Sequence, residues 1–337
     1  MKAMAIHRFG DPLERITIED PVAGYGEAVL RVTGCGVCRT DLKVMRGQLP
    51  VVQRAVLPLV PGHEIVGVVE SLGPEVDGWS VGDRAVVSHF VGCGTCAACR
   101  EGRPTRCLNI QYQIGFNRNG GYAEKVKVPA RNLVRIAPHV PDAEAAVIPD
   151  AVATAVHAVV DRARVGVGDK VLVIGAGGVG LHAAQMAMIC GAHTTVVDVD
   201  EEKVATARGL GVDDAHRVGG LDRLPPSLRV NKVIEASGAL RDFKPIGDIL
   251  ERGGTLVLVG YTMGESLTAN IKDVITAEFE IKGSRAAVVK DLAMAVDLVE
   301  RGKLRPVIDT TVPLTEANEA LARLEAGEFK GRAVLVP

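Results

Sequence analysis

The stretch Lys170–Gly180, KVLVIGAGGVG, decides the fold of this 337-residue chain. Its first part, Val171–Ile174, is an apolar run typical of a buried parallel strand. Gly175, Gly177 and Gly180 follow with G-x-G-x-x-G spacing and open a helix, GGVGLHAAQMAMICG. In this context the first glycine permits a tight turn, the second lets a pyrophosphate approach the backbone, and the third lets helix and strand pack closely.

The glycine loop therefore predicts a dinucleotide-binding site. Gly178 and Val179 begin the helix, whose N-terminus faces the phosphates. Asp198 lies at the end of the next apolar run, at about the 20-residue distance that the fingerprint requires. A carboxylate there accepts two hydrogen bonds from a ribose diol and repels a 2′-phosphate, which favours NAD over NADP. The alternative is a glycine-rich turn followed by a solvated Asp198.

Strands and helices alternate around the loop. The runs TTVVDV, KVIEASG and TLVLVG are typical of strands, EEKVATARGLG is typical of a helix, and a further helix is expected over Phe243–Arg252. This alternation predicts a doubly wound parallel sheet. It ends near Lys282–Arg285, and amphipathic helices over Asp291–Arg301 and Thr315–Ala326 precede a last strand, GRAVLVP.

The chain from Met1 to about Lys127 has a different pattern. β-Branched runs such as AVLRVTG, EIVGVVESLG and YAEKVKVP alternate with Gly and Pro, which predicts a barrel-like β domain. The start, MKAMAIHRFG, lacks the apolar segment of a secretory signal. No stretch approaches about 18 apolar residues without charge, so no membrane span is expected.

Composition limits the partners. Apolar residues make up 47%, charged residues 24%, and the formal net charge is −2, so no basic footprint for nucleic acid is present. Aromatic residues make up only 3%, which argues against platforms that stack bases. A small-molecule substrate is the expected partner.

Four cysteines are spaced C-x2-C-x2-C-x7-C in the run CGTCAACREGRPTRC. Four thiolates in so short a segment are suited to one tetrahedral zinc with no open coordination position, which stabilises a loop. The alternative is a set of unrelated thiols or a redox pair. Clustered thiols in a chain without a secretory signal favour metal ligands in a reducing cytoplasm. The four residues are Cys93, Cys96, Cys99 and Cys107.

Other residues with ligand chemistry are dispersed. Cys38 lies in GCGVCRTD, His63 and Glu64 in PGHEIVG, and Asp150 in IPDAVAT. Each has an ordinary explanation: Cys35 and Cys38 form a C-x-x-C like that of redox proteins, and an aspartate after proline commonly caps a helix. The residues alone do not assemble into one site.

Taken together, the chain resembles the zinc-dependent medium-chain alcohol dehydrogenases over essentially its whole length. The resemblance rests on G-C-G-V-C-R-T-D from Gly34 to Asp41, G-H-E at Gly62–Glu64, the four-cysteine lobe, the glycine loop and Gly331-Arg332. It implies a GroES-like β-barrel catalytic domain, over 1–152 and 287–337, interrupted by an NAD-binding Rossmann domain over 153–286.

The resemblance also implies the catalytic residues. Cys38 and His63 resemble two ligands of a catalytic zinc, and Asp150 falls at the third, where many members have Cys and others have Asp. Glu64 resembles a carboxylate that also approaches the metal, and Asp41 resembles the residue that orients the imidazole.

Substrate chemistry follows from the same resemblance. Thr40 resembles the hydroxyl that contacts the substrate oxygen and passes on its proton, while zinc acts as a Lewis acid and hydride goes to the nicotinamide. Lys43 stands where many members have a histidine that ends a proton relay. A charged lysine donates but does not accept a proton. Three readings stay open: a lowered pKa of Lys43, a relay ending at the cofactor ribose and water, or a solvated side chain.

The remaining matched positions contact NAD in the family. Thr154 resembles the residue that buttresses the nicotinamide, and Lys203 resembles the basic residue beside the adenosine ribose. Arg39 and Arg332 resemble the pair that binds the pyrophosphate.

We therefore expect an NAD(P)-dependent alcohol dehydrogenase with one catalytic and one structural zinc, interconverting primary or secondary alcohols with aldehydes or ketones. The pocket candidates Leu57, Phe90 and Phe116 are apolar and favour simple alcohols; a polyol or sugar dehydrogenase is the alternative. The resemblance further implies a homo-oligomer, a tetramer before a dimer, with the strand after Arg252 at the sheet edge.

Overall fold

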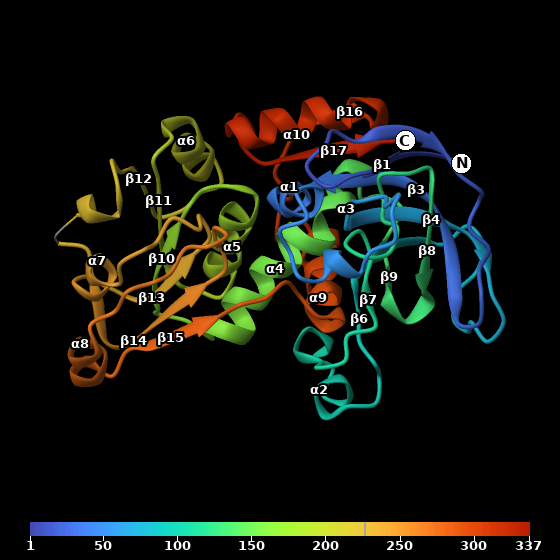
Figure 1. Cartoon of the computed structure of the whole chain (residues 1–337). Coiled ribbons are helices and arrows are strands. Elements are labelled where there is room, and N and C mark those ends of the chain that lie inside the picture. Colours follow the sequence, from blue (N-terminus) through green and yellow to red (C-terminus); the bar gives the residue numbers. More distant parts are fainter. Residues whose placement is uncertain (226) are drawn as a thin grey trace. The chain divides into compact units, whose positions relative to one another are not determined.

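The chain folds into two compact units, and the computed structural model describes residues 1–225 and 227–337 of it (Figure 1). The first unit comprises Met1–Ala153, Ala287–Gly302 and Ile308–Pro337; the second comprises Thr154–Ala286 and Lys303–Val307. The short segment Lys303–Val307 differs from the expected boundaries, which place it in the second catalytic segment.

A seven-stranded sheet forms the first unit, in the order β16-β17-β3-β4-β5-β9 with β8 paired to β3. All its pairings are antiparallel except that of β16 with β17. Two register shifts between β3 and β4 bend the ladder, as closure towards a barrel requires. The strands are β3 (Glu27–Val37), β4 (Glu64–Leu72), β5 (Arg84–Val87), β8 (Lys125–Pro129), β9 (Leu133–Arg135), β16 (Ile308–Pro313) and β17 (Arg332–Val336).

Two smaller β pairs complete this unit: β1 (Lys2–Ala5) with β2 (Glu14–Thr17), and β6 (Phe90–Val91) with β7 (Tyr112–Gln113). Its helical segments are α1 (Arg39–Met45), η1 (Val52–Arg54), α2 (Ala97–Arg100), η2 (Pro104–Arg106), η3 (Ala130–Asn132), α3 (Asp142–Val147), η4 (Ile148–Val152), α9 (Val289–Glu300), η7 (Leu314–Glu316) and α10 (Ala317–Ala326). The last two α-helices confirm the amphipathic helices expected after the alternation ends.

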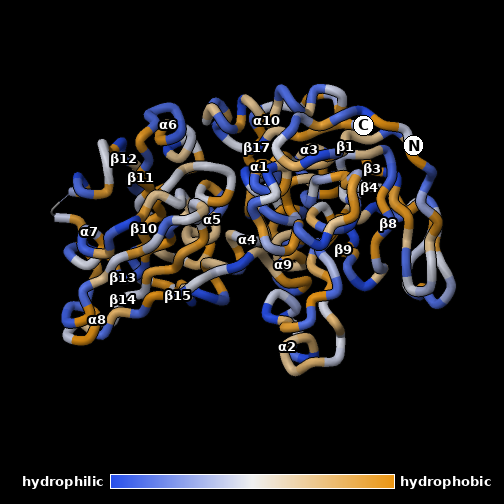
Figure 2. Tube along the Cα trace, in the orientation of Figure 1, coloured by the Kyte–Doolittle hydropathy of each residue, from blue (hydrophilic) through white to orange (hydrophobic). Residues whose placement is uncertain are grey.

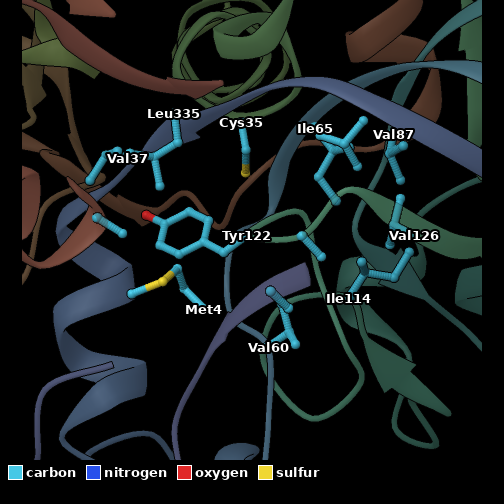
Figure 3. Close-up of a cluster of buried hydrophobic side chains, with 14 of the residues drawn as sticks. Met4, Cys35, Val37, Val60, Ile65, Val87, Ile114, Tyr122, Val126 and Leu335 are labelled. Carbon is cyan, nitrogen blue, oxygen red and sulfur yellow. The ribbon is translucent and has the colours of Figure 1, made fainter. Parts of the chain in front are cut away.

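The core of the first unit packs around Tyr122, which is fully buried among aliphatic side chains (Figure 3). Cys35, Val37 and Leu335 come from neighbouring strands and surround its ring in this view. Its hydroxyl donates a hydrogen bond to Asp41 Oδ2 at 3.1 Å, so the one polar atom in the cluster has a partner. Cys35 is buried in this core, where a thiol packs as a small apolar side chain.

A six-stranded parallel sheet forms the second unit, in the order β12-β11-β10-β13-β14-β15. The chain runs outward from β10 in one direction and then from β13 in the other, so the strand order reverses between these two strands. Ligands bind at the carboxyl ends of strands beside such a reversal. The strands are β10 (Lys170–Ile174), β11 (His193–Asp198), β12 (Asp214–Arg217), β13 (Val230–Glu235), β14 (Leu250–Leu258) and β15 (Glu280–Gly283).

Helices connect these strands. Figure 2 shows hydrophobic residues along the central strands and a largely hydrophilic α6, whose buried side chains are Val204 and Ala207. This pattern is that of strands covered on both faces. The helical segments are α4 (Ala153–Val156), which begins at the last residue of the first unit, η5 (His157–Ala163), α5 (Gly178–Ile189), α6 (Glu201–Gly209), η6 (Leu221–Arg223), α7 (Lys244–Gly247) and α8 (Ile271–Ala277).

Two expectations for this sheet are wrong. The helix expected over Phe243–Arg252 is confined to Lys244–Gly247, because Leu250 already pairs with Val230 and β14 begins there. The strand after Arg252 is not at the edge: β14 lies between β13 and β15, and β15 is the edge strand. The pairing register shifts near the start of β14, where Gly253 has φ 73°. The strand therefore begins irregularly, and its first residues resemble the end of a helix in sequence.

Helical residues run continuously from Asp142 to Ala163 and are apolar enough, by length and composition, to pass for a membrane span. However, 83% of the apolar window is buried inside the protein. Burial of this extent is typical of a core helix, so this segment is only weak evidence for a membrane-spanning helix.

His182 and Gln185 of α5 explain why Lys303–Val307 belongs to the second unit. Gln185 exchanges two hydrogen bonds of 2.9 Å with the backbone of Arg305, and Val307 N donates to His182 Nε2 at 3.0 Å. Polar pairing that sequence periodicity does not reveal thus determines this boundary.

Candidate active site

Strand β3 ends at a point where its two neighbours bring further polar residues. Gly36 pairs with Glu64 of β4, and Ala333 of β17 pairs with Val37. One step further along these antiparallel registers, His63 lies opposite Val37 and Arg332 lies opposite Cys38. A Cβ on Gly36 would lie only 2.1 Å from Glu64 Oε2, so this position must be glycine for the carboxylate to fit.

Asp41 organises the first two candidate ligands. Its Oδ2 accepts from the backbone N–H of Cys38 at 2.9 Å and caps α1, and its Oδ1 lies 3.1 Å from His63 Nδ1. A carboxylate only accepts hydrogen bonds, so Nδ1 carries the proton and the Nε2 lone pair is left for a metal. The imidazole orientation implied by the resemblance is therefore present.

Asp150 completes the set from η4, a π-helical turn that follows α3. Helix α3 packs closely on β3, where a Cβ on Gly34 would lie 3.3 Å from Ala146 Cβ. Asp150 Oδ2 lies 3.6 Å from Cys38 Sγ and 3.8 Å from His63 Nε2.

One ligand atom from each of Cys38, His63, Glu64 and Asp150 lies within 4.8 Å of the others, and all four residues are buried. Thiolate, imidazole and carboxylate are the donor types that zinc takes, and three protein ligands with one open position describe a catalytic site. The residues present therefore fit a catalytic zinc.

Arg332 neutralises the acidic groups of this cluster. Its Nη2 lies 2.9 Å from Glu64 Oε1, 3.3 Å from Asp150 Oδ2 and 3.5 Å from Cys38 Sγ. The contact with Glu64 is an ion pair without hydrogen-bond geometry, so both oxygens of this buried carboxylate lack a hydrogen bond among the described residues. A buried acceptor in that state is suited to approach a cation.

The two carboxyl groups differ in acidity. Burial raises the pKa of Glu64, and the positive charge of Arg332 only partly offsets it. Burial also acts to raise the pKa of Asp150, but its contact with His63 and the positive charge of Arg332 outweigh burial and lower the pKa. Asp150 is thus more readily ionised than Glu64.

Two neighbours on α1 take different positions. Arg39 is exposed, while Thr40 is half-buried and its backbone N–H lies 3.5 Å from Cys38 Sγ. Lys43 is half-buried, and burial lowers its pKa. The three readings of Lys43 stay open, and the lowered pKa is in the direction that the first of them requires.

The four-cysteine lobe gathers its sulfurs as one cluster. The distances are 3.5 Å for Cys93–Cys107, 3.7 Å for Cys96–Cys107 and 4.0 Å for Cys93–Cys99. Four sulfurs held about 2.3 Å from one zinc in a tetrahedron lie roughly 3.8 Å apart. The gathering of all four sulfurs at one point therefore fits a zinc, as predicted. Backbone N–H groups of Thr95 and Cys96 lower the pKa of Cys93 to about 5, which favours a thiolate.

The glycine loop of the second unit also has the expected form. Gly175 has φ 94°, and a Cβ on Gly180 would lie 1.7 Å from the carbonyl oxygen of Gly175, so helix and loop approach too closely for any side chain. A Cβ on Gly177 would meet nothing within 4 Å, which leaves the helix N-terminus open to a phosphate.

Asp198 has a second task that the sequence did not reveal. Its Oδ2 accepts from Ala176 N at 2.7 Å and its Oδ1 accepts from Asp200 N at 3.0 Å, so it anchors the glycine loop. Lys203 lies in α6 and contacts Asp200 at 3.6 Å. Thr154 is buried in α4 at the start of the second unit.

Comparison with known proteins identifies the family. The alcohol dehydrogenase GroES-like domain matches residues 24–142, and the zinc-binding dehydrogenase domain matches residues 178–301. An alcohol dehydrogenase of Geobacillus stearothermophilus is 35% identical over 343 residues, which cover 99% of this chain and 98% of the relative. The chain belongs to the zinc-dependent medium-chain alcohol dehydrogenase family.

Other relatives of this dehydrogenase extend the comparison. An NAD-dependent alcohol dehydrogenase of Sulfolobus acidocaldarius is 33% identical, with 99% of each chain covered. An L-threonine 3-dehydrogenase of Deinococcus radiodurans is 33% identical over 79% of this chain and 77% of its own. The crystal structure of the alcohol dehydrogenase from Aeropyrum pernix matches with a TM-score of 0.90 at 32% identity, covering all of both chains.

These findings confirm the predicted fold class, a GroES-like β-barrel domain with a Rossmann domain. They confirm zinc and NAD as the cofactors at the level of the family, and the two ligand clusters agree with the metal prediction. The dehydrogenase is an alcohol dehydrogenase-type oxidoreductase. The roles of Thr40, Arg39, Thr154, Lys203 and Arg332 stay predictions.

One aromatic neighbour of the metal ligands was missed. The His89 ring, buried after β5, lies 5.2 Å from the ring of His63 and stacks on Phe116 at 5.4 Å. Phe116 itself lies 5.1 Å from His63, and Phe90 lies 4.7 Å from His89. The predicted pocket residues Phe90 and Phe116 thus lie at the site. A histidine between an apolar run and a cysteine motif gave no sequence signal.

Proposed function

We propose that this dehydrogenase uses NAD and a catalytic zinc to interconvert primary or secondary alcohols with aldehydes or ketones. The observation that carries the proposal is the convergence of Cys38, His63 and Asp150, with Glu64 in reserve, at one buried point. When bound, the zinc supplies a Lewis acid that polarises the substrate oxygen and lowers the pKa of its hydroxyl.

The chain's own residues do the remaining work. Asp41 holds the proton on His63 Nδ1 and so keeps Nε2 available as a donor. Arg332 offsets the negative charge of the ligand set. We assign to Thr40 the contact with the substrate hydroxyl and the transfer of its proton, since its half-buried side chain lies two residues from Cys38 on the capped first turn of α1.

Cofactor choice rests on Asp198. We expect the wild type to prefer NAD, and Asp198→Asn to raise the ratio of kcat/KM for NADP over NAD by about tenfold, since hydrogen bonds to a charged group contribute roughly 1.5–3 kcal/mol. Asparagine keeps one oxygen for one of the two N–H groups of Ala176 and Asp200 but presents its N–H₂ group to the other, so the unfolding midpoint of the variant is measured beside its kinetics. Asp222→Asn, at an exposed carboxylate, is the control. A wild type that already prefers NADP contradicts this assignment.

A second substrate class has one observation in its favour. His89 places a polar ring against the ligand His63, where Phe90 and Phe116 are apolar, and the relatives include L-threonine 3-dehydrogenases. This favours a secondary alcohol with a second polar group, such as a polyol or hydroxy amino acid.

A substrate screen of the wild type and His89→Phe decides between the classes. NADH absorbance is followed with aliphatic alcohols, polyols and L-threonine. For simple alcohols we expect His89→Phe to keep or improve kcat/KM, because the change adds apolar surface. For a polar substrate we expect His89→Phe to lower kcat/KM by about tenfold, because the substrate loses one hydrogen bond with the imidazole. Activity on polar substrates alone would replace the first class by the second.

We further propose a cytoplasmic homo-oligomer, a tetramer before a dimer. Strand β15 is an edge strand of the six-stranded sheet, and Ile281 on it and Ile271 and Ile275 on α8 are exposed. Apolar surface beside an edge strand is suited to another copy of the chain. The free thiols of the four-cysteine lobe support a reducing compartment.

A further inference from the structure

Glu235 is a buried acid that the proposed chemistry does not use. It ends β13, is only 1% exposed, and pairs in register with Ile174, the last residue of β10 before Gly175. Strands β10 and β13 flank the point where the sheet order reverses. Glu235 therefore lies at the carboxyl edge of the sheet, directly opposite the glycine loop.

The Glu235 carboxylate closes the turn that follows it. Oε1 accepts from Ser237 N at 3.1 Å, from Gly238 N at 2.9 Å and from the Ser237 hydroxyl, and Oε2 accepts from Gly238 N at 3.1 Å. Ala239 N donates in turn to Ser237 Oγ at 3.1 Å. A single acceptor-only group thus binds two consecutive residues, and Ser237 extends the network to Ala239.

This turn is the surface on which the glycine loop rests. A Cβ on Gly175 would lie 2.9 Å from both the backbone nitrogen and the Cβ of Ser237. On the other side, a Cβ on Gly238, at φ 72°, would lie 2.8 Å from Tyr261 N. The turn is held between two backbone segments and has no room to shift without moving Gly175.

We propose that Glu235 is a positioning residue for the dinucleotide: it holds Ser237 and Gly238 against Gly175 and so fixes the loop that receives the pyrophosphate. This inference rests on the proposed use of NAD. Burying a carboxylate is unfavourable, and here burial raises its pKa. A neutral side chain at this position would be buried at a smaller cost in free energy. The need to hold the turn at one fixed position against Gly175 therefore explains why a glutamate is present.

Binding measurements test the proposal without turnover. Isothermal titration calorimetry of the zinc-loaded protein measures the Kd of NAD and of ADP-ribose, which share the pyrophosphate. Glu235→Gln keeps the size but presents an amide N–H₂ to the N–H donors. We expect both Kd values to rise by about tenfold, the loss of one charge-assisted hydrogen bond. Ser237→Ala, which removes one donor, is expected to raise both by about threefold.

The matched control is Glu251→Gln. Glu251 lies near the start of β14, at the end of the sheet away from the glycine loop, and its exposed carboxylate pairs with Lys170. It should leave both Kd values unchanged. Unchanged Kd values in Glu235→Gln would overturn the proposal, and so would weaker NAD binding with unchanged ADP-ribose binding. If Glu235→Gln does not fold, Ser237→Ala decides: wild-type Kd values there assign the acid a structural role only. A wild type that binds neither ligand contradicts the proposed function instead.

Discussion

Replacing Asp150 by asparagine is expected to lower kcat by at least about a thousandfold while leaving the Kd of NAD within about twofold of the wild type. Asparagine keeps the shape but removes the anionic oxygen that lies 3.6 Å from Cys38 Sγ and 3.8 Å from His63 Nε2. Lewis-acid polarisation contributes several kcal/mol, and each 1.36 kcal/mol is a factor of ten in rate. Steady-state kinetics, calorimetry with NAD and metal analysis measure the three quantities.

The location of the cofactor residues explains why NAD binding is expected to survive the change at Asp150. The glycine loop and Asp198 belong to the second unit, whereas Asp150 belongs to the first. Asp297→Asn, a surface change on α9 beside Arg301, is the matched control and should retain activity. An Asp150→Asn protein with wild-type turnover and metal content would remove Asp150 from the ligand set and leave Glu64 as the third ligand.

Replacing Cys96 by serine is expected to lower stability before it lowers activity. None of the residues of α2 in the lobe is buried, so apolar packing holds this part of the lobe only weakly and we expect the metal to stabilise it. We expect a loss of about 3 kcal/mol, or roughly 6–12 °C in the unfolding midpoint, together with the loss of one zinc. Differential scanning calorimetry and metal analysis record both.

Trypsin gives a local readout of the same change. Arg100 and Arg106 are exposed within the lobe, and cleavage there should accelerate in Cys96→Ser because the loop opens. Cys190→Ser is the control, since this half-buried thiol lies outside both clusters. A Cys96→Ser protein as heat-stable and as resistant to trypsin as the wild type would contradict the structural zinc.

Local patterns revealed the cofactor loop and the lobe. Gly180 contacts Gly175, only five residues before it, and the four cysteines lie within one short segment. The spacing of these residues in the sequence therefore suffices to predict how they lie in space. The catalytic set differs: Cys38 and Asp150 are 112 positions apart. They meet because β3 pairs with β4 and α3 packs on β3, which local periodicity does not specify. Only the family resemblance assembled them.

The errors have the same cause. The helix expected over Phe243–Arg252 yields to a strand because Leu250 finds a partner in Val230, far away in sequence. The contact of Arg332 with Glu64, which follows from the pairing of β17 with β3, was likewise not expected from the sequence; its role at the pyrophosphate stays a prediction. His89 was missed because only the folded chain places it against His63. Each depends on non-local pairing.

Anomalous scattering at the zinc absorption edge, from a crystal of the protein purified without added metal, tests the central claim most directly. We predict two peaks in each chain: one bounded by Cys38 Sγ, His63 Nε2 and a carboxylate oxygen of Asp150, and one among the four sulfurs of the lobe. A peak in the lobe alone, from a preparation that turns over alcohols with NAD, would contradict the account.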